Sequence, residues 1–221
     1  MHLKNQLKSI ARDIEKGITV RIAFTGSHST GKTTAARILR EQIEKVYPSS
    51  STSLLPSVTR AVIDAGGVFS DGLNIGYDQD LDTFQLACIY LRRNWMFSQR
   101  SMNSDFIISE RWAVDEAAYQ GYKQQNSIQS NAKHYYNVAL EEAKWEATNY
   151  WNRIYYIPVS DRGVEDDGVR PLDKEYQKDI DHQINRVLIR VSKSIIIKEV
   201  PLDMDELPKF FEEEVRKWKK K

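Results

Sequence analysis

The sequence predicts an α/β protein whose mostly parallel sheet is covered by helices on both faces. Two observations predict this fold class. Short β-branched and aromatic segments alternate with longer amphipathic segments, as in strands joined by crossover helices. The first of these strands, at 19–25, leads through a glycine-containing loop into the helical pattern of 32–46. A chain of 221 residues suits one domain with a sizeable core.

Each element is predicted from its periodicity. Strands are expected where short apolar runs occur, at 19–25, 51–55, 105–109, 153–158 and 194–199. Helices are expected where apolar residues recur at three- and four-residue spacing, at 32–46, 59–66, 79–102, 112–122, 131–150, 173–191 and 203–219. Residues 1–18 show the same helical spacing, so we expect a helical extension ahead of a main domain at 19–221.

The loop after the first strand has the spacing of a phosphate-binding loop. Its glycines let successive backbone N–H groups point at phosphate oxygens, Lys32 can reach the β- and γ-phosphates, and the Thr33 hydroxyl can join a Mg²⁺ shell. The following helix presents its N-terminus, which favours anions. Within the loop, His28 is expected to be a solvent-facing filler. We predict a site for ATP and Mg²⁺ formed by Gly26, Ser27, His28, Ser29, Thr30, Gly31, Lys32, Thr33 and Thr34.

A carboxylate and an arginine follow the strand at 105–109. Ligands of a parallel sheet collect at the carboxyl ends of its strands, and Glu110 and Arg111 lie at such an end. Glu110 is therefore expected to hold Mg²⁺ together with Thr33, and Arg111 to neutralise charge on a transferring phosphoryl group. Lys32, Glu110 and Arg111 are the catalytic residues predicted from these two motifs.

The segment that begins with this pair resembles a known family. Glu110-Arg111-Trp112, followed by Ala117-Ala118-Tyr119-Gln120-Gly121, is similar to the Asp-Arg-Tyr…Ala-Tyr-Gln-Gly segment of thymidylate kinases. Together with the phosphate loop, it makes roughly residues 19 to 200 resemble the nucleotide-kinase branch of phosphate-loop proteins. That branch spans thymidylate kinases, deoxynucleoside kinases and nicotinamide riboside kinase domains. The resemblance implies a three-layer αβα fold, a five-stranded parallel sheet in the order 2-3-1-4-5, and ATP-dependent phosphorylation of a nucleoside or nucleoside monophosphate.

The resemblance also implies residues that bind the acceptor. Arg60 matches an acceptor-binding arginine that related kinases place after the second strand. Gln85 matches a glutamine of deoxynucleoside kinases that pairs with the edge of the acceptor base, since an amide both donates and accepts hydrogen bonds. Arg92 is expected to reach acceptor phosphate, and Tyr119 completes the expected acceptor site.

One position departs from the family pattern. Many relatives have a glutamate three residues before the arginine, and this chain has Ser57 there. The general base is therefore left open between Glu110, Asp115 and no strong base, because phosphoryl transfer relies mainly on positioning and charge stabilisation.

A polar, glycine-containing segment at about 160–172 resembles a kinase lid, and its Asp-Gly-Val-Arg portion is similar to nicotinamide riboside kinase domains. Lid arginines close over the triphosphate and exclude water. The resemblance therefore adds Arg162 and Arg170 to the expected catalytic residues.

Composition bears on partners and compartment. A single cysteine, Cys88, excludes an internal disulfide framework, and the chain has no signal peptide or membrane-length apolar run, so we expect a cytoplasmic protein without a membrane partner. Relatives are often homodimers. Phage-encoded relatives of thymidylate kinase phosphorylate hydroxymethyluracil within DNA, and the basic end at 216–221 and Ser57 favour a nucleic-acid acceptor as an alternative. The net charge of +1 opposes it.

A nucleotide-dependent switch is the remaining alternative. A GTPase should show an Asn-Lys-x-Asp motif, which the sequence lacks. A motor-type ATPase usually ends an apolar strand in two acidic residues, whereas this strand ends in Glu110-Arg111. Both observations favour the kinase.

Overall fold

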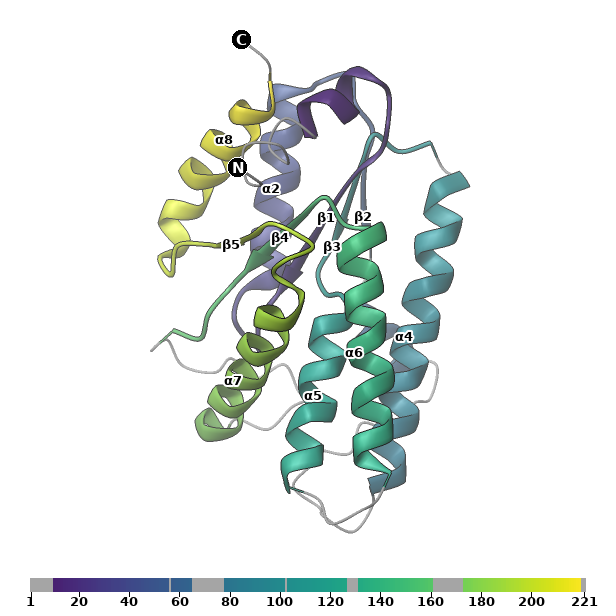
Figure 1. Ribbon diagram of the computed structural model, residues 1–221. Helices are drawn as coiled ribbons and strands as arrows, with labels where there is room; N and C mark the ends of the chain where they lie inside the picture. Colours follow the sequence, from purple (N-terminus) through teal and green to yellow (C-terminus); the bar gives the residue numbers. More distant parts are fainter. Residues whose placement is uncertain are drawn as a thin grey trace.

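The computed structural model describes residues 10–55, 57–64, 78–101, 103–126, 131–160 and 173–219. Five strands form one sheet in the order β2-β3-β1-β4-β5, and every neighbouring pair is parallel (Figure 1). The strands are β1 (Val20–Thr25), β2 (Thr52–Leu55), β3 (Phe106–Ser109), β4 (Arg153–Tyr156) and β5 (Ile197–Glu199). The predicted fold class and strand order are confirmed.

Helices form a layer on each face of this sheet (Figure 1). One layer holds α2 (Lys32–Val46) and α8 (Leu207–Trp218). The other holds α5 (Ala113–Asn126), α6 (Ala132–Asn149) and α7 (Lys174–Val191), with α4 (Asp78–Ser101) beside α5 and α6. A short helix, α3 (Val58–Asp64), follows β2, and a 3₁₀ turn, η1 (Met204–Glu206), precedes α8. The predicted helix at 203–219 is therefore divided, since Pro208 lacks an N–H and is suited to the first turn of a helix.

Strand β1 is buried on both faces. Val20, Ile22 and Phe24 pack in the hydrophobic cluster beneath α2 and α8, whereas Ala23 packs in the cluster beneath α5, α6 and α7. Side chains alternate across a strand, so a strand in the middle of a two-faced sheet is apolar throughout. This burial fixes the end of β1 firmly where the phosphate loop begins.

Helix α5 has almost no solvent-facing side in its first half. Each residue from 113 to 121 is buried, including Asp115, Glu116 and Gln120. Buried carboxylates need partners, because an unpaired charge away from water is costly. The partners that these carboxylates find define much of the candidate site.

Residues 10–15 are helical, and Ile10 is fully buried in the cluster beneath α2 and α8. The amide of Asn152 connects this helix to β1, since its Nδ2 donates to Asp13 Oδ2 at 3.2 Å and its Oδ1 accepts from the Arg21 N–H at 2.7 Å. The rest of the predicted extension, 1–9, lies outside the described residues. Among the helices that the structure describes, none is long and apolar enough to cross a membrane.

Candidate active site

The phosphate loop, Gly26–Thr33, joins β1 to α2. Gly31 has a φ of +85°, a left-handed conformation that glycine adopts without strain. Gly26 lies so close to the end of β4 that a β-carbon there would collide with the carbonyl oxygen of Ile157. Both glycines of the motif are therefore required by the backbone itself. Their arrangement leaves the N-terminus of α2 facing the loop, as anion binding needs.

The ammonium group of Lys32 lies over this loop. Lys32 is 7% exposed, and its Nζ donates to the carbonyl oxygens of Gly26, at 2.8 Å, and Ser27. It also donates to the Thr30 hydroxyl at 3.2 Å. These contacts hold a buried positive charge against the curve of the loop. That placement suits a side chain that stabilises negative phosphate oxygens.

Two oxygen ligands suitable for Mg²⁺ meet at the first turn of α2. The Thr33 hydroxyl donates to Glu110 Oε2 at 2.8 Å, although the residues are 77 positions apart in the sequence. Mg²⁺ prefers oxygen ligands and is usually held by one or two protein groups together with phosphates and water. Within the described residues, no group of three or more His, Cys, Asp or Glu residues is arranged to hold a metal. The Thr33–Glu110 pair fits a nucleotide-dependent Mg²⁺ site rather than an all-protein one.

The expectation that His28 faces solvent is wrong. His28 is fully buried, its ring lies 5.5 Å from that of Tyr176 on α7, and its carbonyl accepts from Gln177 Nε2 at 2.7 Å. The start of α7 covers this part of the loop, which sequence spacing did not indicate. The loop is thus tied directly to the first turns of α7.

Arg111 is buried and held in place by α5. Its Nη1 donates to Asp115 Oδ1 at 2.9 Å, while Asp115 Oδ2 accepts from the Thr25 hydroxyl at 3.1 Å and the Trp112 N–H at 3.3 Å. Burial is the largest single influence and lowers the pKa of Arg111, but Asp115, Tyr119, Glu116 and Glu110 together outweigh it, so the net shift is upward and the guanidinium stays charged. Both oxygens of Asp115 are engaged in orienting this cation and the end of β1.

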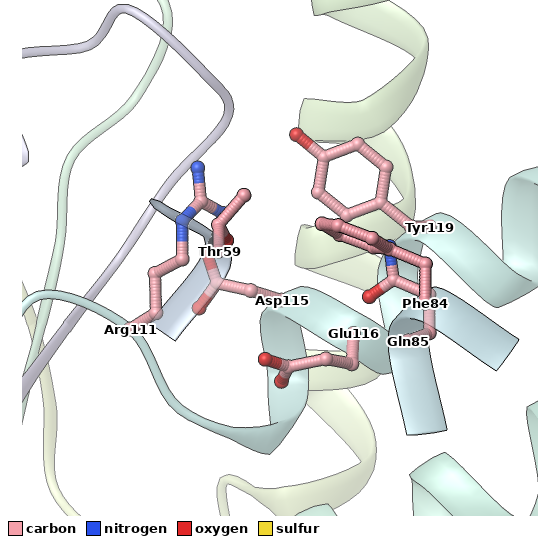
Figure 2. A pocket seen from close by; sticks show the side chains of 7 residues that line it. All are labelled: Thr59, Phe84, Gln85, Arg111, Asp115, Glu116 and Tyr119. Carbon is pink, nitrogen blue, oxygen red and sulfur yellow. Dashed lines mark hydrogen bonds and ion pairs between the residues drawn. The ribbon is translucent and has the colours of Figure 1, made fainter. Parts of the chain in front are cut away.

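A small pocket opens beside Arg111 (Figure 2). Figure 2 shows Arg111 and Asp115 on one side of it and Phe84, Gln85 and Tyr119 on the other, with Glu116 between them. The predicted acceptor residues Gln85 and Tyr119 are thus brought together with a predicted catalytic residue. The pocket is lined by Thr59, Phe84, Gln85, Arg111, Asp115, Glu116 and Tyr119.

Glu116 is a pocket residue that the sequence analysis missed. It is 3% exposed, its Oε1 accepts from Arg92 Nη1 at 2.5 Å, and its Oε2 is buried without a hydrogen-bond partner among the described residues. A buried carboxylate oxygen with no donor is an acceptor available to a ligand. An acidic residue within the apolar run 113–118 is the signal that could have identified it.

Arg92 connects Glu116 to a second buried carboxylate. It is fully buried, and its Nε donates to Glu146 Oε1 at 2.9 Å. Glu146 Oε2 in turn accepts from the Trp151 indole N–H at 2.8 Å and the Ala113 N–H at 3.2 Å. The structure therefore places Arg92 behind the pocket, where it holds Glu116, and not among the residues that line it.

Among the described residues, one further predicted acceptor residue is not brought to the pocket. Arg60 on α3 is exposed and does not line it. The lid residues Arg162 and Arg170 lie outside the described residues, and their roles stay predictions.

A second cavity borders the phosphate loop and was also missed. It has a volume of about 130 Å³ and lies between the loop and the chain that follows β5. Ser29, Thr30, Gly31 and Thr34 line one side, and Ile157, Val200, Pro201, Leu202 and Met204 form most of the apolar remainder. Its position suits the base of a nucleotide whose phosphates occupy the loop. Most of its apolar residues come from two separate segments, one after β4 and one after β5, so no single motif marks them.

The charge of Glu116 should make stability depend on pH. Burial raises the pKa of Glu116 to about 7 from an ordinary value of 4.5, against the attraction of Arg92, which lowers it. The carboxyl group of Glu116 holds its proton more tightly in the folded protein than in the unfolded chain. Protonation of Glu116 therefore contributes its full stability below the unfolded pKa, and this contribution is lost as pH rises through about 7. We expect the free energy of unfolding, measured with denaturant, to fall between about pH 5 and pH 8 more steeply in the wild type than in Glu116→Gln. Parallel profiles would contradict this assignment.

Comparison with known proteins places the fold. The model of a protein family described as AAA domain matches residues 21–202. No curated protein matches the chain significantly. Among solved structures, thymidylate kinase from Ehrlichia chaffeensis matches with a TM-score of 0.54 and 18% identity, over 90% of this chain and 97% of the other.

Two other solved structures share the fold. Deoxyadenosine kinase from M. mycoides, solved with the products dCMP and dCDP, has a TM-score of 0.58 at 12% identity and covers 89% of this chain and 98% of its own. The protein NadR in complex with NR has a TM-score of 0.56 at 18% identity, over 81% of this chain and 45% of the other. The predicted resemblance to nucleotide kinases is confirmed at the level of the fold.

Proposed function

This chain belongs to the AAA domain family, and we propose that it is an ATP-dependent kinase that phosphorylates a nucleoside or a nucleoside monophosphate. One observation carries the proposal. The consecutive residues Glu110 and Arg111 face different parts of the site. Glu110 accepts a hydrogen bond from Thr33 of the phosphate loop. Arg111 lines the pocket that contains Gln85 and Glu116. A donor site and a candidate acceptor site thus meet at one strand end.

The donor half is assigned to the phosphate loop. The loop N–H groups would surround the β-phosphate of ATP, and Lys32 would neutralise charge on its β- and γ-oxygens. Thr33 and Glu110 would hold Mg²⁺, which bridges phosphate oxygens and offsets their charge. The cavity between the loop and Val200–Met204 would receive the adenine. Lys32 is held by buried contacts, whereas Thr33 and Glu110 meet through an exposed hydrogen bond, where phosphate and water can complete a Mg²⁺ shell.

The acceptor half is assigned to the pocket in Figure 2. Glu116 Oε2 can accept from an N–H on the edge of a heterocyclic base, and the Gln85 amide can both donate and accept there. The rings of Phe84 and Tyr119 supply aromatic surface for the face of the base. This combination of a polar edge and aromatic walls matches the chemistry of a nucleobase, but the volume of the pocket is about 10 Å³, so a base would enter only as the lining side chains move apart.

Arg111 would stabilise the phosphoryl group in transfer. Asp115 holds its guanidinium beside the pocket, and both Asp115 oxygens already accept hydrogen bonds, so Asp115 is a positioning residue in this proposal. Phosphoryl transfer passes through a loose transition state, so it needs aligned reactants and charge neutralisation more than a strong base. The proposal therefore does not require a replacement for the glutamate absent at Ser57.

Screening for an acceptor tests the proposal. Nucleosides, nucleoside monophosphates, nicotinamide riboside and duplex DNA would be incubated with ATP and Mg²⁺, and ADP formation measured with and without each. We expect ADP formation that depends on one small-molecule acceptor. In the Glu116→Gln variant, the KM for that acceptor should rise by about tenfold to a hundredfold, and the KM for ATP should stay unchanged. ATP hydrolysis that no acceptor stimulates, but a protein partner does, would support the switch instead.

A further inference from the structure

A separate cavity lies among α5, α6 and α7, which run side by side in Figure 1. Its volume is about 330 Å³, within the range of sites for small ligands. The lining includes three cations, Lys133 on α6 and Arg186 and Arg190 on α7, and no carboxylate. The other lining groups are carboxamide side chains, Gly121 and Tyr136. The residues of this cavity are entirely different from those of the pocket beside Arg111.

No carboxylate in the described part of the chain neutralises the three cations. Arg190 instead lies over the ring of Tyr136, with its guanidinium carbon 5.6 Å from the ring centroid. All three residues are exposed, so water screens the repulsion between them, and an anion in the cavity that they line would be attracted by each. Guanidinium groups in particular match the geometry of phosphate oxygens.

The neutral part of the lining keeps the cavity open and polar. Gln183 Nε2 donates to Gln125 Oε1 at 2.5 Å, which spans α7 and α5. A β-carbon at Gly121 would lie 3.1 Å from both Gln183 Oε1 and Tyr136 Cε2, so a glycine allows these helices to approach at the cavity floor. The carboxamides offer donors and acceptors for hydroxyl or base groups next to a phosphate.

We propose that the cavity of Lys133, Arg186 and Arg190 is a second binding site, for a small phosphate-bearing molecule. The site stands apart from the proposed kinase activity and does not depend on it. Its ligand is an inorganic phosphate or a nucleotide, because both present the oxyanion that the cations recognise. The cavity is large enough for more than a phosphate group, and its carboxamide side chains can form hydrogen bonds with the rest of the ligand.

The phosphate loop also binds phosphates, so the test removes that contribution first. In a Lys32→Ala protein, binding of pyrophosphate and of AMP would be measured by calorimetry. Adding Arg186→Ala and Arg190→Ala should then weaken binding at least tenfold, since two charge-assisted contacts are lost. A Lys178→Ala/Lys193→Ala pair removes the same charge from exposed positions in and just after α7, outside the cavity, and should leave affinity unchanged.

A third variant separates a cavity from a merely basic surface. Asn137→Trp fills the space from α6 while all three cations remain, and it should abolish the same binding. Preference for AMP over pyrophosphate would identify a nucleotide ligand, and equal binding an inorganic one. Three results would overturn the proposal. The Lys178/Lys193 control could lose as much affinity as the arginine variant, or Asn137→Trp could retain binding. The protein could also bind duplex DNA but neither pyrophosphate nor AMP. Unfolding midpoints of every variant establish that each is folded.

Discussion

Replacement of Lys32 by alanine should lower the rate of acceptor phosphorylation by about a hundredfold to a thousandfold. The magnitude is that of removing one preorganised donor from a site that stabilises developing negative charge. Lys32 is 7% exposed, and its three N–H donors are directed at Gly26 O, Ser27 O and the Thr30 hydroxyl, so phosphate oxygens would replace part of this set without the side chain leaving the loop. Initial rates of ADP formation at saturating ATP and acceptor measure the effect.

A matched control lies on the same helix. Lys45 is exposed in the last turn of α2, and Lys45→Ala should keep the wild-type rate. Circular dichroism and unfolding midpoints would establish that both variants are folded. A Lys32→Ala protein that is folded and retains the full rate would show that the loop does not support catalysis as proposed.

Replacement of Arg92 by methionine should have the largest effect on stability. Arg92 is fully buried between Glu116 and Glu146, and its removal leaves two carboxylates without their counter-charge. Breaking a buried pair in this way typically costs about 3–5 kcal/mol. Denaturant titration of the wild type and of Arg92→Met, at one pH, measures the difference in the free energy of unfolding.

The neighbouring residue provides the control for Arg92. Arg93 pairs with Glu142 at 2.8 Å, but its side chain is 41% exposed, so Arg93→Met should cost only about 0–1 kcal/mol. Adding Glu116→Gln and Glu146→Gln to Arg92→Met should recover part of the loss, because the uncompensated charges disappear. Equal losses for Arg92→Met and Arg93→Met would show that the buried network does not act as described.

The phosphate loop and Glu110 were predictable because local signals coincide there. Gly26, Gly31, Lys32 and Thr33 have the spacing of a strand–loop–helix unit, and Glu110 follows a strand that begins with three consecutive apolar residues, 106–108. The edge of a parallel sheet then brings the two segments together without further information. The order of the strands in the sheet therefore accounts for the proximity of Thr33 and Glu110, which are joined by a hydrogen bond of 2.8 Å.

The polar interior was not predictable in the same way. Arg92 was expected to contact acceptor phosphate, and its actual partners, Glu116 and Glu146, lie 24 and 54 residues further along the chain. Pairing between three helices depends on how they pack, which periodicity alone does not specify. His28 illustrates the same limit, since its burial results from α7 covering the loop. Nothing in the loop's own spacing indicates that cover.

Helix α5 has a consequence for how sequences with this fold can diverge. Most helices tolerate change on the face that meets water, and their variable positions recur with the helical period. The first half of α5 has no such face: Asp115, Glu116 and Tyr119 meet the candidate acceptor pocket, Gly121 borders the basic cavity, and the residues at 117, 118 and 120 are buried. A change of substrate preference through α5 therefore requires simultaneous substitution of several residues that pack against one another. New specificities should arise more readily at exposed positions such as Arg60 on α3 and Leu202 after β5.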